Sequence, residues 1–156
     1  MKSDRAFVDV ALEFCGWAEG EQRAPQAEAE TARRLLAELY CRALELPVAV
    51  ECPDEDNESR LDWQAVYRRF ASLPFSYYGQ VTDPLAVPPT DDHALGDLGD
   101  DLADIWSDLQ AGRQLYAKGR REEAHASWRW YFDFHWGKHA CDALQALHFW
   151  FQHAPK

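Results

Sequence analysis

The pattern that most constrains the fold is a long segment, from about residue 121 to 152, that is apolar or aromatic almost throughout. On a helical wheel its polar strip is narrow and consists of Ser127, Lys138, Gln145 and Gln152. A helix with so little polar surface is expected to pack on several sides and to lie at the centre of a bundle. Gly119 separates it from a second helical pattern over about residues 98–118, which predicts an antiparallel helical hairpin.

Three further segments have apolar residues at helical spacing, over about residues 4–17, 25–46 and 63–70. The second of these ends before Pro47, because proline cannot continue a helix. Together with the hairpin, these segments predict an all-α fold for residues 1–156, in which a single domain forms a bundle of about five helices with the C-terminal hairpin at its centre. The chain is long enough to bury one core of this kind.

Two connecting segments have no helical pattern. Residues 75–93 are rich in proline and aromatic residues, so we expect an ordered loop with room for one extended segment. Residues 52–60 are acidic and resemble the start of a calcium loop. Ser59 and Ala65 stand where that loop requires glycine and glutamate, so a solvated connector is the better interpretation.

The charge of the chain argues against one large class of partners. Its formal net charge is -11 and its pI about 4.9, whereas binding to nucleic-acid phosphates requires clustered Lys and Arg. Asp9 and Glu13 interrupt the apolar residues near the start of the chain, so we expect no signal peptide and no membrane anchor, and a cytoplasmic location. The four cysteines form no C-x-x-C pair, which favours reduced thiols over a zinc knuckle.

A small set of polar residues interrupts the apolar C-terminal helix. His135, His139 and Asp142 lie on one face, at i, i+4 and i+7, and we expect them to be largely buried and to need partners. Counting residues from Gly119 puts Asp104 level with His135, and Asp100 level with His139. The preceding helix therefore supplies carboxylates at the right height, from a ridge formed by Asp97, Asp101, Asp104 and Asp108.

Three interpretations of this cluster remain open. In the first, the Asp and His side chains hydrogen-bond to one another and fix the register of the two helices. In the second, His135 and His139 are ligands of a divalent metal (Mn, Zn, Fe or Mg), with Asp101, Asp104 or Asp142 as carboxylate ligands. In the third, the D-D-x-x-D spacing of Asp100, Asp101 and Asp104 binds magnesium and diphosphate, as in isoprenoid synthases, although those enzymes need a longer chain to build their cavity.

The sequence contains no complete catalytic set. Short helical nucleotide pyrophosphohydrolases have a similar acidic helix, but they also need a Glu-rich partner helix, for which Glu28 and Glu30 are weak candidates. The leading hypothesis is therefore a non-enzymatic interaction or structural protein, with a protein partner or a second copy recognised through the aromatic residues 75–78. The alternative is a metal-binding protein or a metal-dependent (phospho)hydrolase that uses the Asp/His cluster.

Two blocks resemble a family of small bacterial all-helical proteins that form a domain of unknown function. DDLADIWSDL is similar to the family's D-D-L-x-D-I-(Y/W)-x-D-L, and HWGKHACDALQALH is similar to its H-W-G-x-H-x-x-D-A-L-x-A-L-H. The resemblance implies an all-α fold but no activity. The positions that match its signature are Asp100, Asp101, Asp104, Asp108, Trp128, His135, Trp136, Gly137, His139, Asp142 and His148.

Overall fold

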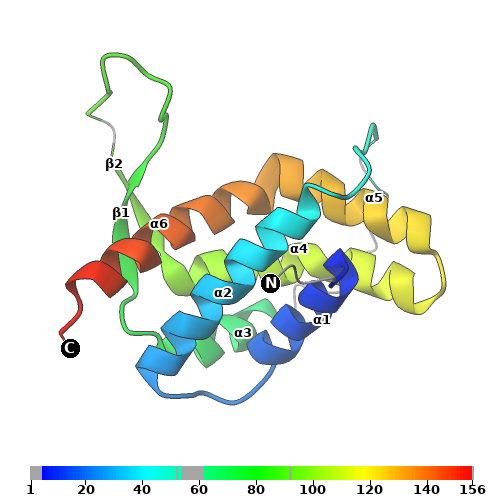
Figure 1. Cartoon of the computed structure of the whole chain (residues 1–156), viewed down its shortest axis with the longest axis horizontal. Coiled ribbons are helices and arrows are strands. Elements are labelled where there is room, and N and C mark those ends of the chain that lie inside the picture. Colours follow the sequence, from blue (N-terminus) through cyan, green and yellow to red (C-terminus); the bar gives the residue numbers. More distant parts are fainter. Residues whose placement is uncertain (1–4, 52, 54–61, 92, 156) are drawn as a thin grey trace.

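The computed structural model describes residues 5–51, 53, 62–91 and 93–155, and its elements form a bundle with one projecting arm (Figure 1). The prediction of a mainly helical bundle is confirmed. The acidic connector expected at 52–60 lies outside the described residues, except for Pro53. In chain order the elements are α1 (Phe7–Ala18), α2 (Pro25–Ala43), α3 (Trp63–Arg69), the 3-10 turn η2 (Phe70–Ser72), β1 (Tyr77–Val81), β2 (His93–Asp97), α4 (Leu98–Ala117), α5 (Arg121–Tyr131), the π turn η3 (Phe132–Trp136) and α6 (Gly137–His153).

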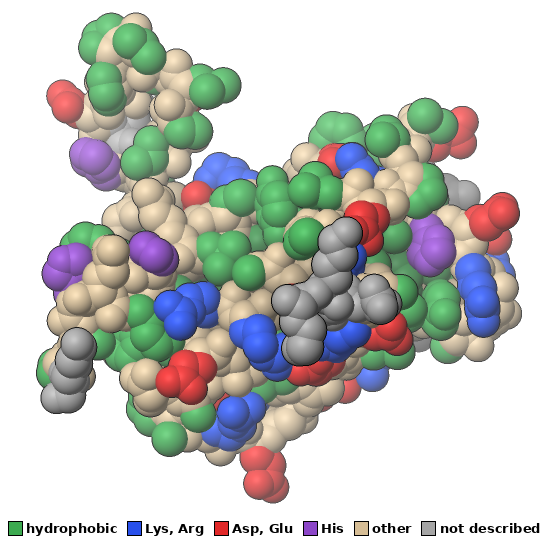
Figure 2. Space-filling model, viewed as in Figure 1, with side chains coloured by type: hydrophobic (Ala, Val, Ile, Leu, Met, Phe, Trp, Pro, Cys, Tyr) green, Lys and Arg blue, Asp and Glu red, His purple; other side chains and the backbone are tan. Residues whose placement is uncertain are grey.

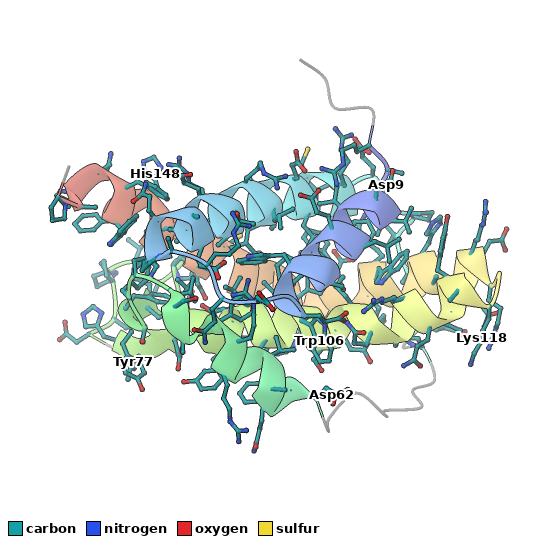
Figure 3. All side chains as sticks on the ribbon, turned by 90° about the horizontal axis from the view of Figure 1, so that it is seen from below. Asp9, Asp62, Tyr77, Trp106, Lys118 and His148 are labelled. Carbon is teal, nitrogen blue, oxygen red and sulfur yellow. The ribbon has the colours of Figure 1, made fainter. Side chains whose placement is uncertain are left out.

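The central helix of the bundle is α4. It packs against α1, α3, α5 and α6, and its apolar stripe is fully buried at Leu98, Leu102, Ile105 and Leu109. All six helices contribute to one hydrophobic core. Figure 3 shows α4 running the length of the molecule, from the end marked by Tyr77 to the end marked by Lys118.

Within the predicted C-terminal hairpin, α4 is the more enclosed arm, and the last helix is less covered than its apolar pattern predicts. The continuous run of α5, η3 and α6 lies on the outside of α4, and α2 covers one further side of α6. These neighbours do not cover the whole circumference of the helix. Phe134 and Phe149 therefore remain 68% and 62% exposed.

A π turn interrupts this long helix at the histidines. The N–H of Gly137 donates to the carbonyl of Phe132, five residues earlier, instead of four as in an α-helix. A Cβ at position 137 would lie 2.5 Å from that carbonyl oxygen, so the turn requires glycine there. Gly137 of the H-W-G sequence therefore allows the π turn to form, and His135 lies within that turn.

Residues 75–93 contain more regular structure than expected. β1 and β2 form an antiparallel hairpin that pairs Tyr77 with Asp97 and Val81 with His93. The intervening residues form the arm that projects from the bundle, and Figure 2 shows hydrophobic side chains gathered on it. Side chains along both strands alternate between exposed and less exposed positions, but the sequences YYGQV and HALGD do not alternate apolar with polar residues, so the sequence carries little signal for them.

No helix in the described ranges is both long enough and apolar enough to cross a membrane.

Candidate metal centre

Three side chains bring ligand atoms together beside the start of α6, one from α4 and two from the continuous run of α5, η3 and α6. Asp104 comes from α4, His135 from the π turn and His139 from α6, and one ligand atom from each lies within 4.8 Å of the others. The two Nε2 atoms are 3.2 Å apart, and the Nε2 of His139 lies 3.5 Å from the Oδ2 of Asp104. Two nitrogens and one oxygen therefore converge on a single point.

A second layer of side chains holds each of these three groups in orientation. The Nδ1 atoms of both imidazoles face carboxylates at 2.6 Å, from Asp108 for His135 and from Asp101 for His139. The indole N–H of Trp63, in α3, donates to the Oδ1 of Asp104 at 2.8 Å. Outer-layer hydrogen bonds of this kind fix the tautomer of a ligating histidine and the orientation of a ligating carboxylate.

The β1–β2 hairpin adds one more residue, Tyr78, to this outer layer. The hydroxyl of Tyr78, in β1, donates to the Oδ2 of Asp101, whose other oxygen faces His139. The Tyr78 ring crosses the backbone of Gly96 on the paired strand, where a Cβ would lie 2.3 Å from the ring. Burial and the Asp101 carboxylate both raise the pKa of Tyr78, so its hydroxyl remains a donor at neutral pH.

The heights predicted by counting residues are corrected by about one turn for His135 and by one residue for His139. His135 faces Asp108 instead of Asp104, and His139 faces Asp101 instead of Asp100. Helical side chains lean towards the N-terminus of their own helix, so in an antiparallel pair the two sets lean towards each other. Each histidine therefore meets a carboxylate that is closer to the hairpin turn than a level count predicts.

The cluster is also more open than expected. The His135 side chain is 48% exposed, whereas the side chains of Asp101 and Asp108 beneath it are 4% and 13% exposed. The exposure follows from the outer position of the long helix on α4. One side of the converging ligand atoms consequently faces solvent, and the other side rests on buried carboxylates.

The electrostatics of the two histidines follow from these partners. The hydrogen bond to Asp108 raises the pKa of His135 above its ordinary value. Burial acts to lower the pKa of His139, but the hydrogen bond and charge of Asp101 outweigh it, so the pKa is raised. Burial raises the pKa values of Asp101 and Asp108. The site therefore holds positive charge well on its imidazoles.

Two other candidate residues lie elsewhere. Asp142 accepts hydrogen bonds from Gln80 at 2.5 Å and from Lys138 at 2.6 Å, so it ties β1 to α6 and stands outside the converging group. Glu28, considered for a Glu-rich partner helix, is fully buried in an ion pair with Arg69. These contacts give both carboxylates a structural role.

A family model described as a domain of unknown function (DUF5063) matches residues 1–153. The chain belongs to this family. A crystal structure of protein BF1032 from Bacteroides fragilis is similar to it, with 24% sequence identity, a TM-score of 0.72, and coverage of 96% of this chain and 92% of that one. This likeness concerns the fold. No curated protein matches the chain.

In this DUF5063 chain, the sequence pattern predicts the candidate ligands His135, His139 and Asp104 but not all of the side chains behind them. The sequence pattern places Trp63 on the apolar face of a short helix and Tyr78 in an aromatic loop, with no indication that either contacts the cluster. A Trp at the start of a helix and a Tyr in a strand carry no local signal for an acidic partner far away in the chain. The family signature contains Asp108, which is the partner of His135.

Proposed function

We propose that this protein binds one divalent transition-metal ion through His135, His139 and Asp104. The observation that supports this most strongly is the 3.2 Å separation of the two Nε2 atoms. Each Nδ1 faces a carboxylate and so carries the proton, which leaves a lone pair on each neutral Nε2. Two lone pairs that face each other repel unless a cation lies between them.

The cation can be a proton or a metal ion, and the third group favours the metal. Metal–imidazole bonds are about 2.0–2.1 Å long, so two nitrogens on one tetrahedral ion lie about 3.3 Å apart. The Asp104 oxygen lies 3.5 Å from His139, close to the same spacing, and it adds a negative charge on the same side. A shared proton needs only two acceptors, whereas this group presents three.

The ligand set narrows the choice of metal and of chemistry. Two imidazoles and one carboxylate suit zinc, iron(II) or manganese better than magnesium, which prefers oxygen ligands. Three protein ligands with a solvent-facing side are also the arrangement of catalytic metal sites, which keep a position for water or substrate. We therefore infer a centre able to polarise a bound ligand, of the kind used in metal-dependent hydrolysis or oxygen chemistry.

Metal analysis tests this proposal directly. Protein prepared without a polyhistidine tag is expected to bind about one equivalent of zinc, manganese or iron(II) and to melt several degrees higher when loaded, since a ligand that binds only the folded state stabilises it. Because protons compete for imidazoles whose pKa values are raised, the shift should decrease as the pH falls through and below that raised range. Absence of both stoichiometric metal and any EDTA-sensitive melting shift would contradict the proposal.

A second function, interaction with a protein partner or with another copy, has support from the arm. Leu85 and Val87 are 86% and 91% exposed there. Figure 2 shows hydrophobic side chains gathered on the arm. A chain with both residues changed to Asp is expected to lose any association that sedimentation velocity or pull-down detects in the parent protein. Val50→Asp, which changes an equally exposed valine away from the arm, is the control. Equal association of all three proteins would contradict this role.

A further inference from the structure

The charge around the proposed metal centre is unusually one-sided. Four carboxylates project from α4, from Asp100, Asp101, Asp104 and Asp108, and a fifth, Asp97, caps the N-terminus of the same helix. Within the described residues, none of the five forms an ion pair with a lysine or arginine side chain. A divalent ion supplies only two positive charges against the four carboxylates of α4, so the occupied centre remains negative.

Two possible sources of compensating positive charge beside the site are already engaged. Lys138, on the turn between the two histidines, pairs with Asp142 at 2.6 Å. The N-terminus of α4 is capped by Asp97, whose Oδ1 accepts the N–H groups of Gly99 and Asp100. The positive end of that helix dipole therefore faces carboxylates and is not free to hold an added anion.

Burial keeps this negative charge effective at the metal. The side chains of Asp101 and Asp108 are almost excluded from water, so salt screens them less than it screens surface charges. Burial raises the pKa of Asp100, and the neighbouring charges of Asp104 and Asp97 raise it further. Sites that accept phosphate groups present the opposite arrangement, with Arg or Lys side chains or uncapped helix N–H groups.

We infer that the open side of this metal centre accepts a neutral or cationic ligand, such as an amide carbonyl or an amine, and discriminates against phosphate esters and other anions. The inference rests on the proposed metal centre and specifies its substrate class. It also separates this protein from the D-D-x-x-D enzymes, in which metal ions bridge aspartates and a diphosphate. Here Asp101 and Asp104 face His139 instead.

Cobalt(II) offers a direct measurement, because its visible absorption changes when an added ligand enters its coordination shell. The cobalt-loaded protein is titrated with imidazole as the neutral probe, and with azide and inorganic phosphate as anionic probes. The parent protein is expected to bind imidazole and to bind both anions more weakly. Asp100→Asn removes one charge from a residue outside the converging ligand group, so it should strengthen anion binding about three- to tenfold. Imidazole binding should change less than twofold.

The control is Glu122→Gln, which removes an exposed charge in the first turn of α5. It should change the affinity neither for imidazole nor for the anions. Phosphate that binds the parent protein as tightly as imidazole does would overturn the inference, as would an Asp100→Asn effect of equal size on both kinds of probe. A protein that takes up no cobalt would contradict the metal centre itself. The two failures therefore give different results.

Discussion

Glu28→Ala is expected to lower the free energy of unfolding by about 3–5 kcal/mol, because it leaves a buried guanidinium without its counter-charge. Glu28 is fully buried and accepts hydrogen bonds from Trp17 at 2.8 Å, from the backbone N–H of Arg23 at 2.9 Å and from Arg69 at 2.5 Å. The ion pair joins α2 to α3, and Arg69 is itself only 9% exposed. Equilibrium unfolding in urea measures the loss.

A matched control and a double variant make this result specific. Glu30→Ala removes an exposed carboxylate from the same helix and should change stability by less than about 0.5 kcal/mol. Replacing Glu28 and Arg69 together by Met should recover much of the loss, since the cost arises from the unpaired charge. A Glu28→Ala protein that is as stable as the Glu30→Ala protein would contradict the account.

The pH dependence of the Glu28 contribution has a definite sign. Burial acts to raise the pKa of Glu28, but hydrogen bonds from Arg69 and Trp17 outweigh it and hold the pKa below its ordinary value. A carboxylate whose folded-state pKa is lowered stabilises the protein above its unfolded pKa and loses that contribution as the pH falls through the folded value. The difference between the parent protein and Glu28→Ala should therefore narrow in acid.

The helices could be predicted because their signals are local. Apolar residues at three- and four-residue spacing located all five helical segments, and α4 was expected over 98–118 and found at Leu98–Ala117. The sequence also predicted that histidines and carboxylates would meet across the hairpin. These features depend on spacing within one helix or on two helices joined by a short turn.

What could not be predicted depends on contacts between distant segments. The height of each Asp relative to each His depends on the lean of the side chains, and the backbone at His135 is a π turn. Trp63 and Tyr78 reach the site only after α3 and β1 pack against α4, over separations of 41 and 23 residues. A helical wheel also does not show how many neighbouring elements will cover the apolar surface of a helix. The pattern therefore predicts a buried His135, whereas its side chain is exposed.

His139→Ala is expected to weaken metal binding by about 100-fold or more, because it removes a ligand whose outer partners alone account for about 10- to 100-fold in comparable sites. Isothermal titration with zinc measures the change. The apo protein should also lose about 1–3 kcal/mol of stability, since the Asp101 side chain, 4% exposed, is then left with Tyr78 as its one remaining side-chain partner in the described structure. His148→Ala is the control, because His148 is an exposed histidine in the same helix (Figure 3).

The two effects of His139→Ala separate a metal ligand from a residue that only fixes the helix register. If the histidines share a proton and hold no metal, the variant loses the same stability with and without zinc, and zinc does not raise the melting temperature of the parent protein. If they bind a metal, the parent and His148→Ala proteins gain stability from zinc, and the loss caused by His139→Ala grows with zinc concentration. The zinc dependence of the stability difference therefore distinguishes the ion from the hydrogen-bond network, independently of any substrate.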